Sequence, residues 1–413
     1  PKSSNHAKRV APFRLENQIG FTIGGPVVLP RFGEGGPYFY SGKGRTFFFT
    51  DYQRWSDRQL GSGLTLKGAP TAAGRAELQA RAGDRPQMQA LLRFVPAGIP
   101  NGQSRSVAMN DGSIFDVELG DLAGSSDFRF DSHQGSVRID HLYNENNLVY
   151  GRYRYSYEFT SGIGQVTPPG LGTKGGNEAK AAVIVWTTSL TSAISNEAMI
   201  AWKNFQADRD GIDPDSAAIP SIQINDLGML GALWSPGRTA IGLAANLPAG
   251  YINDTYQISD AISISKGNHS FKFGVDLRRT DVKSFFFPSG RGSLVYTTLS
   301  DFVNDVAETA TKTLPLAGGD FFPFYRRHEF YSYAQDQWRI MPNLTLTYGV
   351  RYEYPGDSFK YLRGLNKRIL SFYNNHPDFR FSPEPKTDVN NWMPRVGFNW
   401  NPKTRGNGII GFI

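Results

Sequence analysis

Residues Phe271-Lys-Phe-Gly-Val-Asp-Leu-Arg278 alternate between an apolar residue and a polar residue or glycine. Successive side chains of a β-strand point to opposite faces of the sheet. One face of this segment therefore carries Phe271, Phe273, Val275 and Leu277. The opposite face carries Lys272, Gly274, Asp276 and Arg278. The pattern predicts a strand that has one apolar face and one charged face.

The same alternation recurs elsewhere in the chain. Leu344–Tyr354 sets threonine, arginine and glutamate opposite a row of leucine, valine and tyrosine. Val149–Tyr157 sets two arginines opposite tyrosines. Asp260 breaks the pattern by falling among apolar positions, and Glu329–Arg339 alternates poorly. We therefore expect several strands of the same two-faced kind.

A soluble β-protein alternates too, so alternation alone leaves a soluble fold and a membrane β-barrel open. Two details favour the membrane. An arginine or lysine that faces hydrocarbon at mid-bilayer costs about 2–4 kcal/mol, and these strands keep such residues on one face. Several apolar rows end in aromatic residues, as the girdles of outer-membrane barrels do. We predict an all-β, antiparallel up-and-down transmembrane β-barrel.

The predicted strands come in pairs, with a short turn inside each pair. The pairs are Phe128–Leu142 with Asn147–Phe159, Ala181–Thr191 with Glu197–Phe205, Thr255–Ser265 with Ser270–Arg279, Phe330–Ile340 with Leu344–Tyr354, and Pro394–Trp400 with Gly408–Ile413. Two more strands near Phe21 and Phe48 bring the total to about a dozen. Long loops are expected at 56–127, 160–180, 206–253, 280–325 and 355–393. Short turns at one end of a sheet and long loops at the other are typical of outer-membrane barrels.

One loop contains a helical insertion. Within Thr71–Phe94, apolar residues recur at helical spacing. Pro86 is expected to divide this segment into two short helices, because proline interrupts a helix.

Composition excludes several classes of protein. The chain has no cysteine, which excludes disulfides, thiolate metal sites and cysteine nucleophiles. No stretch approaches the ~20 apolar residues of a membrane helix. The net charge of +7 is spread along the 413 residues without a block of one sign, so nucleic acid is not expected as a partner. No catalytic residue, enzyme activity or cofactor is predicted.

The two ends suggest a piece of a longer protein. Gly408–Ile413 reads as a strand cut in mid-run, and Pro1–Val10 lacks the apolar core of a signal peptide. Part of a barrel has two unpaired edges. We therefore expect an open sheet in place of a closed barrel.

The charged face supplies the candidate functional residues. They are expected to face a water-lined interior, where they would contact a substrate or a plug domain, or else form salt bridges within the wall. These residues are Arg138, Asp140, Arg152, Arg154, Lys272, Asp276, Arg278, Arg351 and Glu353.

Clustered carboxylates provide one weak metal candidate, since such clusters suit Ca²⁺. The cluster consists of Asp208, Asp210, Asp213 and Asp215. The spacing of an EF-hand fails, because Gly211 occupies loop position four and no glutamate closes the loop. A solvated loop is the preferred interpretation, and no metal is expected.

Several blocks of sequence resemble TonB-dependent outer-membrane receptors, in particular the Oar-like group. The blocks are Asn17–Val28, Gly44–Tyr52, Val137–His141 with Asn146–Tyr153, Gly267–Arg279, Tyr333–Arg339 with Leu344–Glu353, and Asn391–Phe398. Within them, the residues expected to be structural are Gly24, Gly25, Pro26, Phe47, Phe48, Phe49, Phe271, Phe273, Gly274, Tyr333, Asp336, Trp338, Gly349, Pro394, Arg395 and Gly397.

The resemblance implies a barrel of roughly 22 strands with a plugged lumen. This chain would hold the N-terminal portion of the barrel in residues 18–413, and residues 1–17 would be the exit from a plug domain. The implied partners are outer-membrane lipid of a Gram-negative bacterium, the plug domain, a periplasmic TonB complex that acts through an N-terminal region, and an unknown extracellular solute.

The function that follows is uptake of a large, scarce solute, with loops such as Thr160–Gly176 and Asp210–Gly250 forming the recognition surface. Two alternatives stay open. One is a non-transporting surface β-protein, an adhesin or structural module. The other is a secreted carbohydrate-active β-enzyme.

Overall fold

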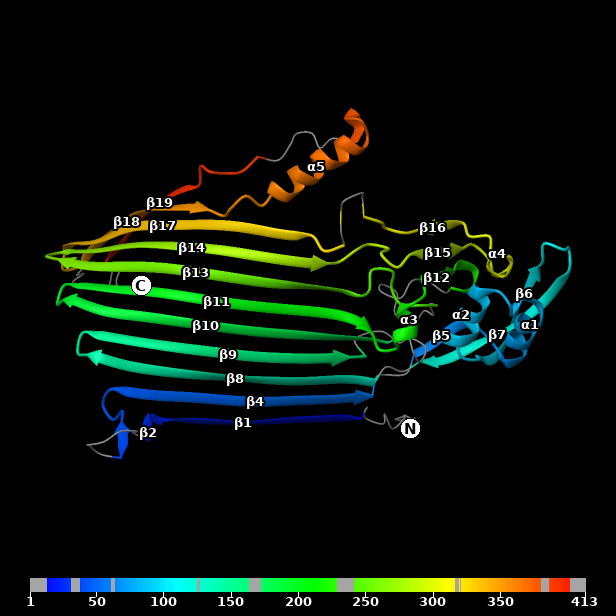
Figure 1. Ribbon diagram of the computed structural model, residues 1–413, viewed down its shortest axis with the longest axis horizontal. Helices are drawn as coiled ribbons and strands as arrows, with labels where there is room; N and C mark the ends of the chain where they lie inside the picture. The colour runs from blue at the N-terminus through cyan, green and yellow to red at the C-terminus, as the bar shows by residue number, and fades with distance from the viewer. Residues whose placement is uncertain are drawn as a thin grey trace, which may run out of the picture.

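The computed structural model describes residues 13–30, 38–60, 64–124, 127–162, 172–228, 241–315, 319, 321–379 and 386–401. One antiparallel sheet of 11 strands dominates it (Figure 1). In spatial order the strands are β1 (Arg14–Pro26), β4 (Thr46–Leu60), β8 (Asp127–Asn144), β9 (Asn147–Ser161), β10 (Thr173–Thr191), β11 (Ile194–Gly211), β13 (Ala249–Lys266), β14 (His269–Phe285), β17 (Phe324–Met341), β18 (Leu344–Tyr354) and β19 (Trp392–Trp400). Within the described residues no pairing joins β1 to β19, so the prediction of an open sheet is confirmed.

Four of the predicted strand pairs are confirmed as hairpins. They are β8–β9, β10–β11, β13–β14 and β17–β18, and their turns gather at one end of the sheet (Figure 1). In the β13–β14 turn, Gly267 has φ +59°, a left-handed conformation that glycine adopts with little strain. In the fifth predicted pair, Pro394–Trp400 lies in β19, and Gly408–Ile413 falls outside the described residues.

Several strands extend further into the predicted loops than the alternation indicated. β10 begins at Thr173 and β11 continues to Gly211, within the segments 160–180 and 206–253. Glycine, lysine and asparagine interrupt the apolar pattern there, but backbone hydrogen bonding between strands does not require apolar side chains. Residues 1–12, 163–171 and 229–240 of the predicted plug exit and recognition loops lie outside the described residues.

The apolar face of the sheet is uncovered. On β14, Phe273, Val275 and Leu277 are exposed by 41%, 45% and 49%, so no second layer formed by the described residues packs on them. Directly opposed residues of paired strands share a face. Through the register, this apolar face continues to Ile258, Ile200 and Ile184. The other side, which carries Asp276 and Arg278, is called the charged face below.

Asp260 does lie on the apolar face, as the sequence pattern indicated. It stands opposite Val275 on β14. Asn196 on β11 donates a hydrogen bond of 2.8 Å from Nδ2 to Oδ1 of this carboxylate. The amide therefore gives the polar side chain a partner within the sheet.

At the end of the sheet opposite the hairpin turns, segments from three predicted loops fold together into a cap (Figure 1). Its elements are β5 (Leu64–Pro70), α1 (Ala72–Ala82), α2 (Pro86–Phe94), β6 (Ile99–Ala108), β7 (Ile114–Gly124), β12 (Ser221–Ile224), η1 (Asn225–Leu227), β15 (Ser293–Tyr296), α4 (Leu299–Asn304) and β16 (Thr309–Thr311). The two helices divided at Pro86 are confirmed. Most of the expected loop 56–127 is instead folded structure.

The cap contains a contiguous hydrophobic core. Leu78, Met88, Ile224 and Phe302 are all 0% exposed and belong to one cluster. Gln87 on α2 also donates a hydrogen bond of 3.2 Å to the carbonyl of Phe302. These segments lie far apart in sequence, so burial of their apolar side chains depends on the tertiary fold.

The remaining elements belong neither to the 11-stranded sheet nor to the cap. They are β2 (Val28–Pro30), β3 (Phe39–Ser41), α3 (Pro214–Ala217), α5 (Lys360–Phe372) and η2 (Pro377–Phe379). None of the helices in the described part of the chain is both long enough and apolar enough to cross a membrane.

Candidate functional site

A cavity of about 500 Å³ lies along the charged face of strands β11, β13, β14, β17 and β18. Its polar lining includes Glu197, Asp276, Arg278, Tyr331, Arg351 and Glu353. Four of the nine residues predicted for the charged face are therefore brought together. The register explains this, since Tyr331 stands opposite both Asp276 on β14 and Glu353 on β18.

The charged groups of this cavity are paired along their own strands. Arg278 donates from Nε and Nη2 to the two carboxylate oxygens of Asp276, at 2.9 and 3.0 Å. Gln257 donates a third hydrogen bond of 2.6 Å to Asp276. Arg351 forms an ion pair with Glu353. Residues two apart on a strand share a face, so the two side chains of each pair lie next to each other on the charged face.

The other predicted residues of the charged face lie on different strands. On β8, Arg138 donates to Asp140 at 2.6 Å and its guanidinium lies 3.8 Å from the ring centre of Tyr150. Arg152 and Arg154 on β9 donate to neighbouring side chains on β8 at 3.2 and 3.3 Å. Lys272 lies on β14 toward the hairpin turn. None of these five residues lines the cavity, and the contacts of the four on β8 and β9 stay within the wall.

A row of contacts extends the cavity toward the cap end of the sheet. Glu329 on β17 is buried, at 7% exposure. Its carboxylate accepts hydrogen bonds from Arg327 at 2.8 Å, Tyr331 at 2.7 Å and Thr280 at 3.2 Å. The Arg278 guanidinium in turn lies 5.3 Å from the ring centre of Tyr331. Arg327, Glu329, Tyr331 and Arg278 therefore form a continuous polar row on one face.

Sequence reasoning missed Glu329. The segment Glu329–Arg339 alternates poorly, so no face could be assigned to it with the pattern alone. The β14–β17 register places Glu329 opposite Arg278. Only this pairing identifies it as a member of the charged face.

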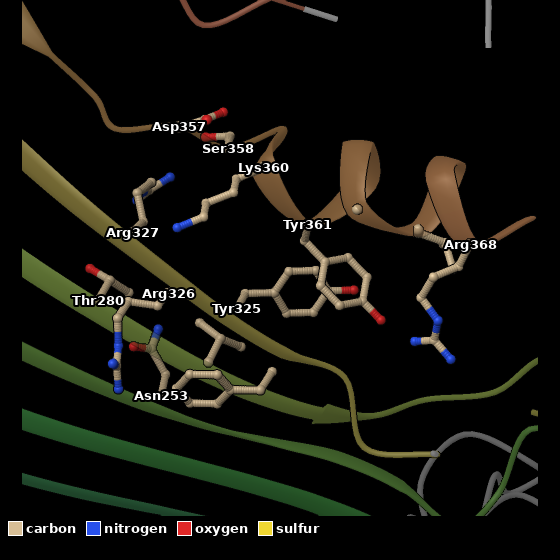
Figure 2. Close-up of a pocket in the computed structure, with 14 residues that line it drawn as sticks. Asn253, Thr280, Tyr325, Arg326, Arg327, Asp357, Ser358, Lys360, Tyr361 and Arg368 are labelled. Atoms are coloured by element: carbon tan, nitrogen blue, oxygen red, sulfur yellow. The ribbon is translucent and has the colours of Figure 1, made fainter. Parts of the chain in front are cut away.

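A second cavity, of about 630 Å³, lies between α5 and the cap-side ends of β13, β14 and β17 (Figure 2). The sheet contributes Thr280, Tyr325 and Arg327 to its lining, and α5 contributes Lys360, Tyr361 and Arg368. The rings of Tyr325 and Tyr361 meet with their centres 4.3 Å apart at an angle of 52°. This cavity is called the α5 pocket below.

An ion pair links the start of α5 to a residue that lies just before the helix. Asp357 pairs with Arg363, one turn into the helix. Desolvation opposes ionisation of Asp357, but hydrogen bonds from Arg363 and Thr387 hold its pKa below the ordinary value. The carboxylate is thus ionised at neutral pH and already accepts hydrogen bonds from its partners.

The structural residues of the predicted motifs fall at close contacts. Gly24, Gly25 and Pro26 end β1 opposite Phe49, Phe48 and Phe47 of β4, so two blocks of the resemblance pair with each other. Asp336 lies on the apolar face beside the hairpin turn of β13–β14. It is 4% exposed and interacts with His269 Nδ1 at 2.6 Å and Tyr348 OH at 2.8 Å.

The other motif residues lie on β14, β17, β18 and β19. The His269 ring stacks with Trp338, with ring centres 5.2 Å apart. The rings of Phe271 and Phe273 also stack with each other. Gly349 lies where a Cβ would come within 2.6 Å of the Ala334 carbonyl. Pro394, Arg395 and Gly397 lie on β19, at an edge of the sheet, where proline is tolerated.

The aspartates of the weak metal candidate have other partners. Asp213 caps α3 by accepting a hydrogen bond of 3.0 Å from the Asp215 backbone. Asp210 accepts one of 2.7 Å from the Gly211 backbone, and Asp215 pairs with Arg93 of the cap. Among the residues that the structure describes, no group of three His, Asp or Glu side chains is placed to hold a metal ion. Asp208 lies near the end of β11.

The model of the family described as "Outer membrane beta barrel domain" matches residues 3–409. No curated protein matches the chain. Among solved structures, it is similar to the outer membrane transporter YddB from Escherichia coli, with 11% identity and a TM-score of 0.43 over 83% of this chain and 34% of that one.

Two further structures show likeness at the same level. The open form of the Ferric-Catecholate import receptor Fiu from E. coli K12 has 11% identity and a TM-score of 0.41, covering 83% of this chain and 47% of that one. The siderophore receptor PiuA from Acinetobacter baumannii has 9% identity and a TM-score of 0.39, covering 82% and 42%. The chain thus spans between 34% and 47% of the length of these three proteins.

Proposed function

Because the chain belongs to the outer membrane β-barrel domain family, we propose that it forms part of the wall of a barrel that takes up a solute. The protein is located in the outer membrane of a Gram-negative bacterium. In the proposed barrel the apolar face contacts lipid and the charged face lines an aqueous lumen, the arrangement found in transmembrane barrels.

One observation carries the proposal of transport. The polar row from Arg327 through Glu329 and Tyr331 to Arg278 connects the α5 pocket with the charged-face cavity. A wall that only anchored the protein in lipid would need no such succession of polar groups beside two cavities. A succession of this kind gives a hydrated solute polar partners along the length of the sheet.

The finer proposal is a TonB-dependent receptor of the Oar-like group. The chain would supply the N-terminal portion of a barrel of roughly 22 strands. A plug domain would fill the lumen, and a periplasmic TonB complex would draw on the proton gradient of the inner membrane. The solute would be large and scarce, with the cap and neighbouring loops capturing it.

Solute depletion tests the transport proposal directly. A strain that lacks the gene and a strain that carries the full-length gene are grown in one complex medium, and mass spectrometry follows each solute. We expect at least one solute to disappear only with the gene present, and a protonophore to stop its uptake. Equal depletion by both strains would refute transport.

Variants connect uptake to the charged face. The double variant Arg278→Gln, Arg351→Gln should slow depletion of that solute, while Arg81→Gln on the exposed side of the cap should leave it unchanged. Loss of surface attachment without any change in depletion would instead support an adhesin. Gene-dependent release of sugar fragments from a polysaccharide would support the secreted enzyme.

A further inference from the structure

We propose that the α5 pocket binds an aromatic carboxylate, and that this group is the part of the solute by which the protein recognises it. That this group belongs to a transported solute rests on the uptake function proposed above. Binding of the aromatic carboxylate itself rests only on the contacts and charges of the pocket.

Cationic residues outnumber acidic residues in the lining of the α5 pocket. Four lining residues are cationic, namely Arg326, Arg327, Lys360 and Arg368, and Asp357 alone is acidic. Two of these cations have carboxylate partners just outside the lining, since Arg326 pairs with Asp281 and Arg327 with Glu329. An anion would therefore enter a site of favourable potential. The cations come from both walls, so they could hold an anion between the sheet and the helix.

The carboxylates near the pocket already have ion-pair or hydrogen-bond partners. Asp357 pairs with Arg363, and Glu329, just beyond the lining, accepts three hydrogen bonds. Lys360 forms no ion pair with any residue that the structure describes. Figure 2 shows its side chain reaching from α5 toward Arg327 on β17. Arg327 is paired with Glu329, so Lys360 is the lining cation that an anion from outside would pair with.

The aromatic pair determines what else the ligand carries. Tyr325 and Tyr361 come from opposite walls and meet at 4.3 Å between ring centres. Tyrosine faces pack favourably on a planar ring. The pocket volume of about 630 Å³ lies within the usual roughly 300–1,000 Å³ of small-molecule sites. A planar ring that bears a carboxylate would use both the tyrosines and the cations.

The first turn of α5 adds to the preference for an anion. No acidic residue lies within this turn, although Asp357 just before it accepts a hydrogen bond of 3.2 Å from the Phe359 backbone N–H. Helix N-termini carry a partial positive charge and unpaired N–H groups. Lys360 and Tyr361 of this turn line the pocket, so the backbone dipole and the lysine act on the same volume.

The pocket also lies on the route toward the charged-face cavity. Thr280, which lines the pocket, is the next residue after Arg278 on the same face of β14. Residues two apart on a strand are separated by roughly 7 Å. A ligand released from the α5 pocket would therefore meet Arg278 next.

Calorimetry on the full chain purified in detergent tests this site with three probes. Benzoate carries both the ring and the anion, benzamide the ring without charge, and acetate the anion without the ring. We expect benzoate to bind at least tenfold more tightly than either of the others. Equal affinity of benzoate and benzamide would overturn the proposal, because charge would then contribute nothing.

A matched pair of variants locates the site. Lys360→Gln should weaken benzoate binding at least fivefold and leave benzamide unchanged. Lys367→Gln removes the same charge from an exposed position of α5 outside the pocket lining, and should leave benzoate binding unchanged. Lys360→Arg should retain binding. If the two glutamine variants weaken benzoate equally, the pocket is not the site.

The outcomes separate this site from the transport function. Lys360-dependent benzoate binding without gene-dependent uptake would refute transport and leave the binding site. Gene-dependent uptake without benzoate binding would refute the site and leave transport. Because Lys360 is exposed, its substitution should not prevent folding, and circular dichroism of each variant checks this.

Discussion

Tyr333 lies directly opposite Gly274 on paired strands, and its ring occupies the space that a Cβ at position 274 would need. Both residues lie on the charged face, where Tyr333 also lines the cavity with Arg351 and Glu353. The glycine thus lets the ring lie close to the backbone of β14. The family resemblance marked both residues without saying why they belong together.

Substitution of this glycine should destabilise the sheet. Gly274→Val would force the Tyr333 ring to move, at a cost of about 1–3 kcal/mol for an overpacked site. The free energy of unfolding in urea, measured in detergent, checks this. Gly397→Val is the matched control, because nothing lies within 4 Å of a Cβ there. A similar loss in both variants would contradict the role given to Tyr333.

A charge on the apolar face should be costly if that face contacts lipid. Ile258→Lys places an amine where the side chain is 56% exposed on the apolar face, and should cost about 2–4 kcal/mol at mid-bilayer. Gln257→Lys places the same amine on the charged face, beside the Asp276 carboxylate that Gln257 contacts, and should be nearly neutral.

Folding into phospholipid vesicles measures this difference. The equilibrium free energy of folding is determined for both lysine variants in vesicles and in buffer with short-chain detergent. The lipid proposal predicts a penalty for Ile258→Lys that is larger in vesicles. Equal penalties for the two positions would show that the apolar face does not meet hydrocarbon.

The buried carboxylate of the polar row should matter for stability. Glu329→Ala removes the acceptor for Arg327, Tyr331 and Thr280. The lost hydrogen bonds to the buried carboxylate should cost about 1–3 kcal/mol, because the Arg327 side chain is 41% exposed and water can solvate its charge. Thermal unfolding should reveal the loss. Glu77→Ala breaks only an exposed contact of 3.9 Å with Arg81 and should cost no more than about 1 kcal/mol.

The cap should lose stability in alkali. Tyr296 is fully buried, and burial, together with a hydrogen bond of 2.8 Å to Asp305, raises its pKa well above the ordinary value of 10.0. The protonated form is therefore favoured in the folded cap. Its contribution is fully present below about pH 10 and declines as the pH rises above the pKa of the unfolded tyrosine.

Hydrogen exchange checks the alkaline prediction. Protection of α4 and β15 is measured by mass spectrometry at pH 8 and pH 11, after correction for intrinsic exchange rates. Tyr296→Phe should lower protection at pH 8, because the hydrogen bond is lost, and should show a smaller further loss at pH 11. A variant that declines as steeply as the natural protein would indicate another titrating group.

The sequence by itself determined the two-faced strands, the four hairpins and the division of the helical insertion at Pro86. These features are local, because a strand alternates with a period of two and short turns join neighbouring strands. Alternation also identified Asp276, Arg278, Arg351 and Glu353 as residues of one face.

Only the tertiary structure decided the cap, the place of Glu329 and the α5 pocket. The cap core joins segments such as α2 and α4, which the contact of Gln87 with Phe302 links across more than 200 positions. Glu329 acquires its role from the register with β14. Tyr361 meets Tyr325 only because α5 folds back over β17. Contacts between segments so distant in sequence leave no local periodicity from which to infer them.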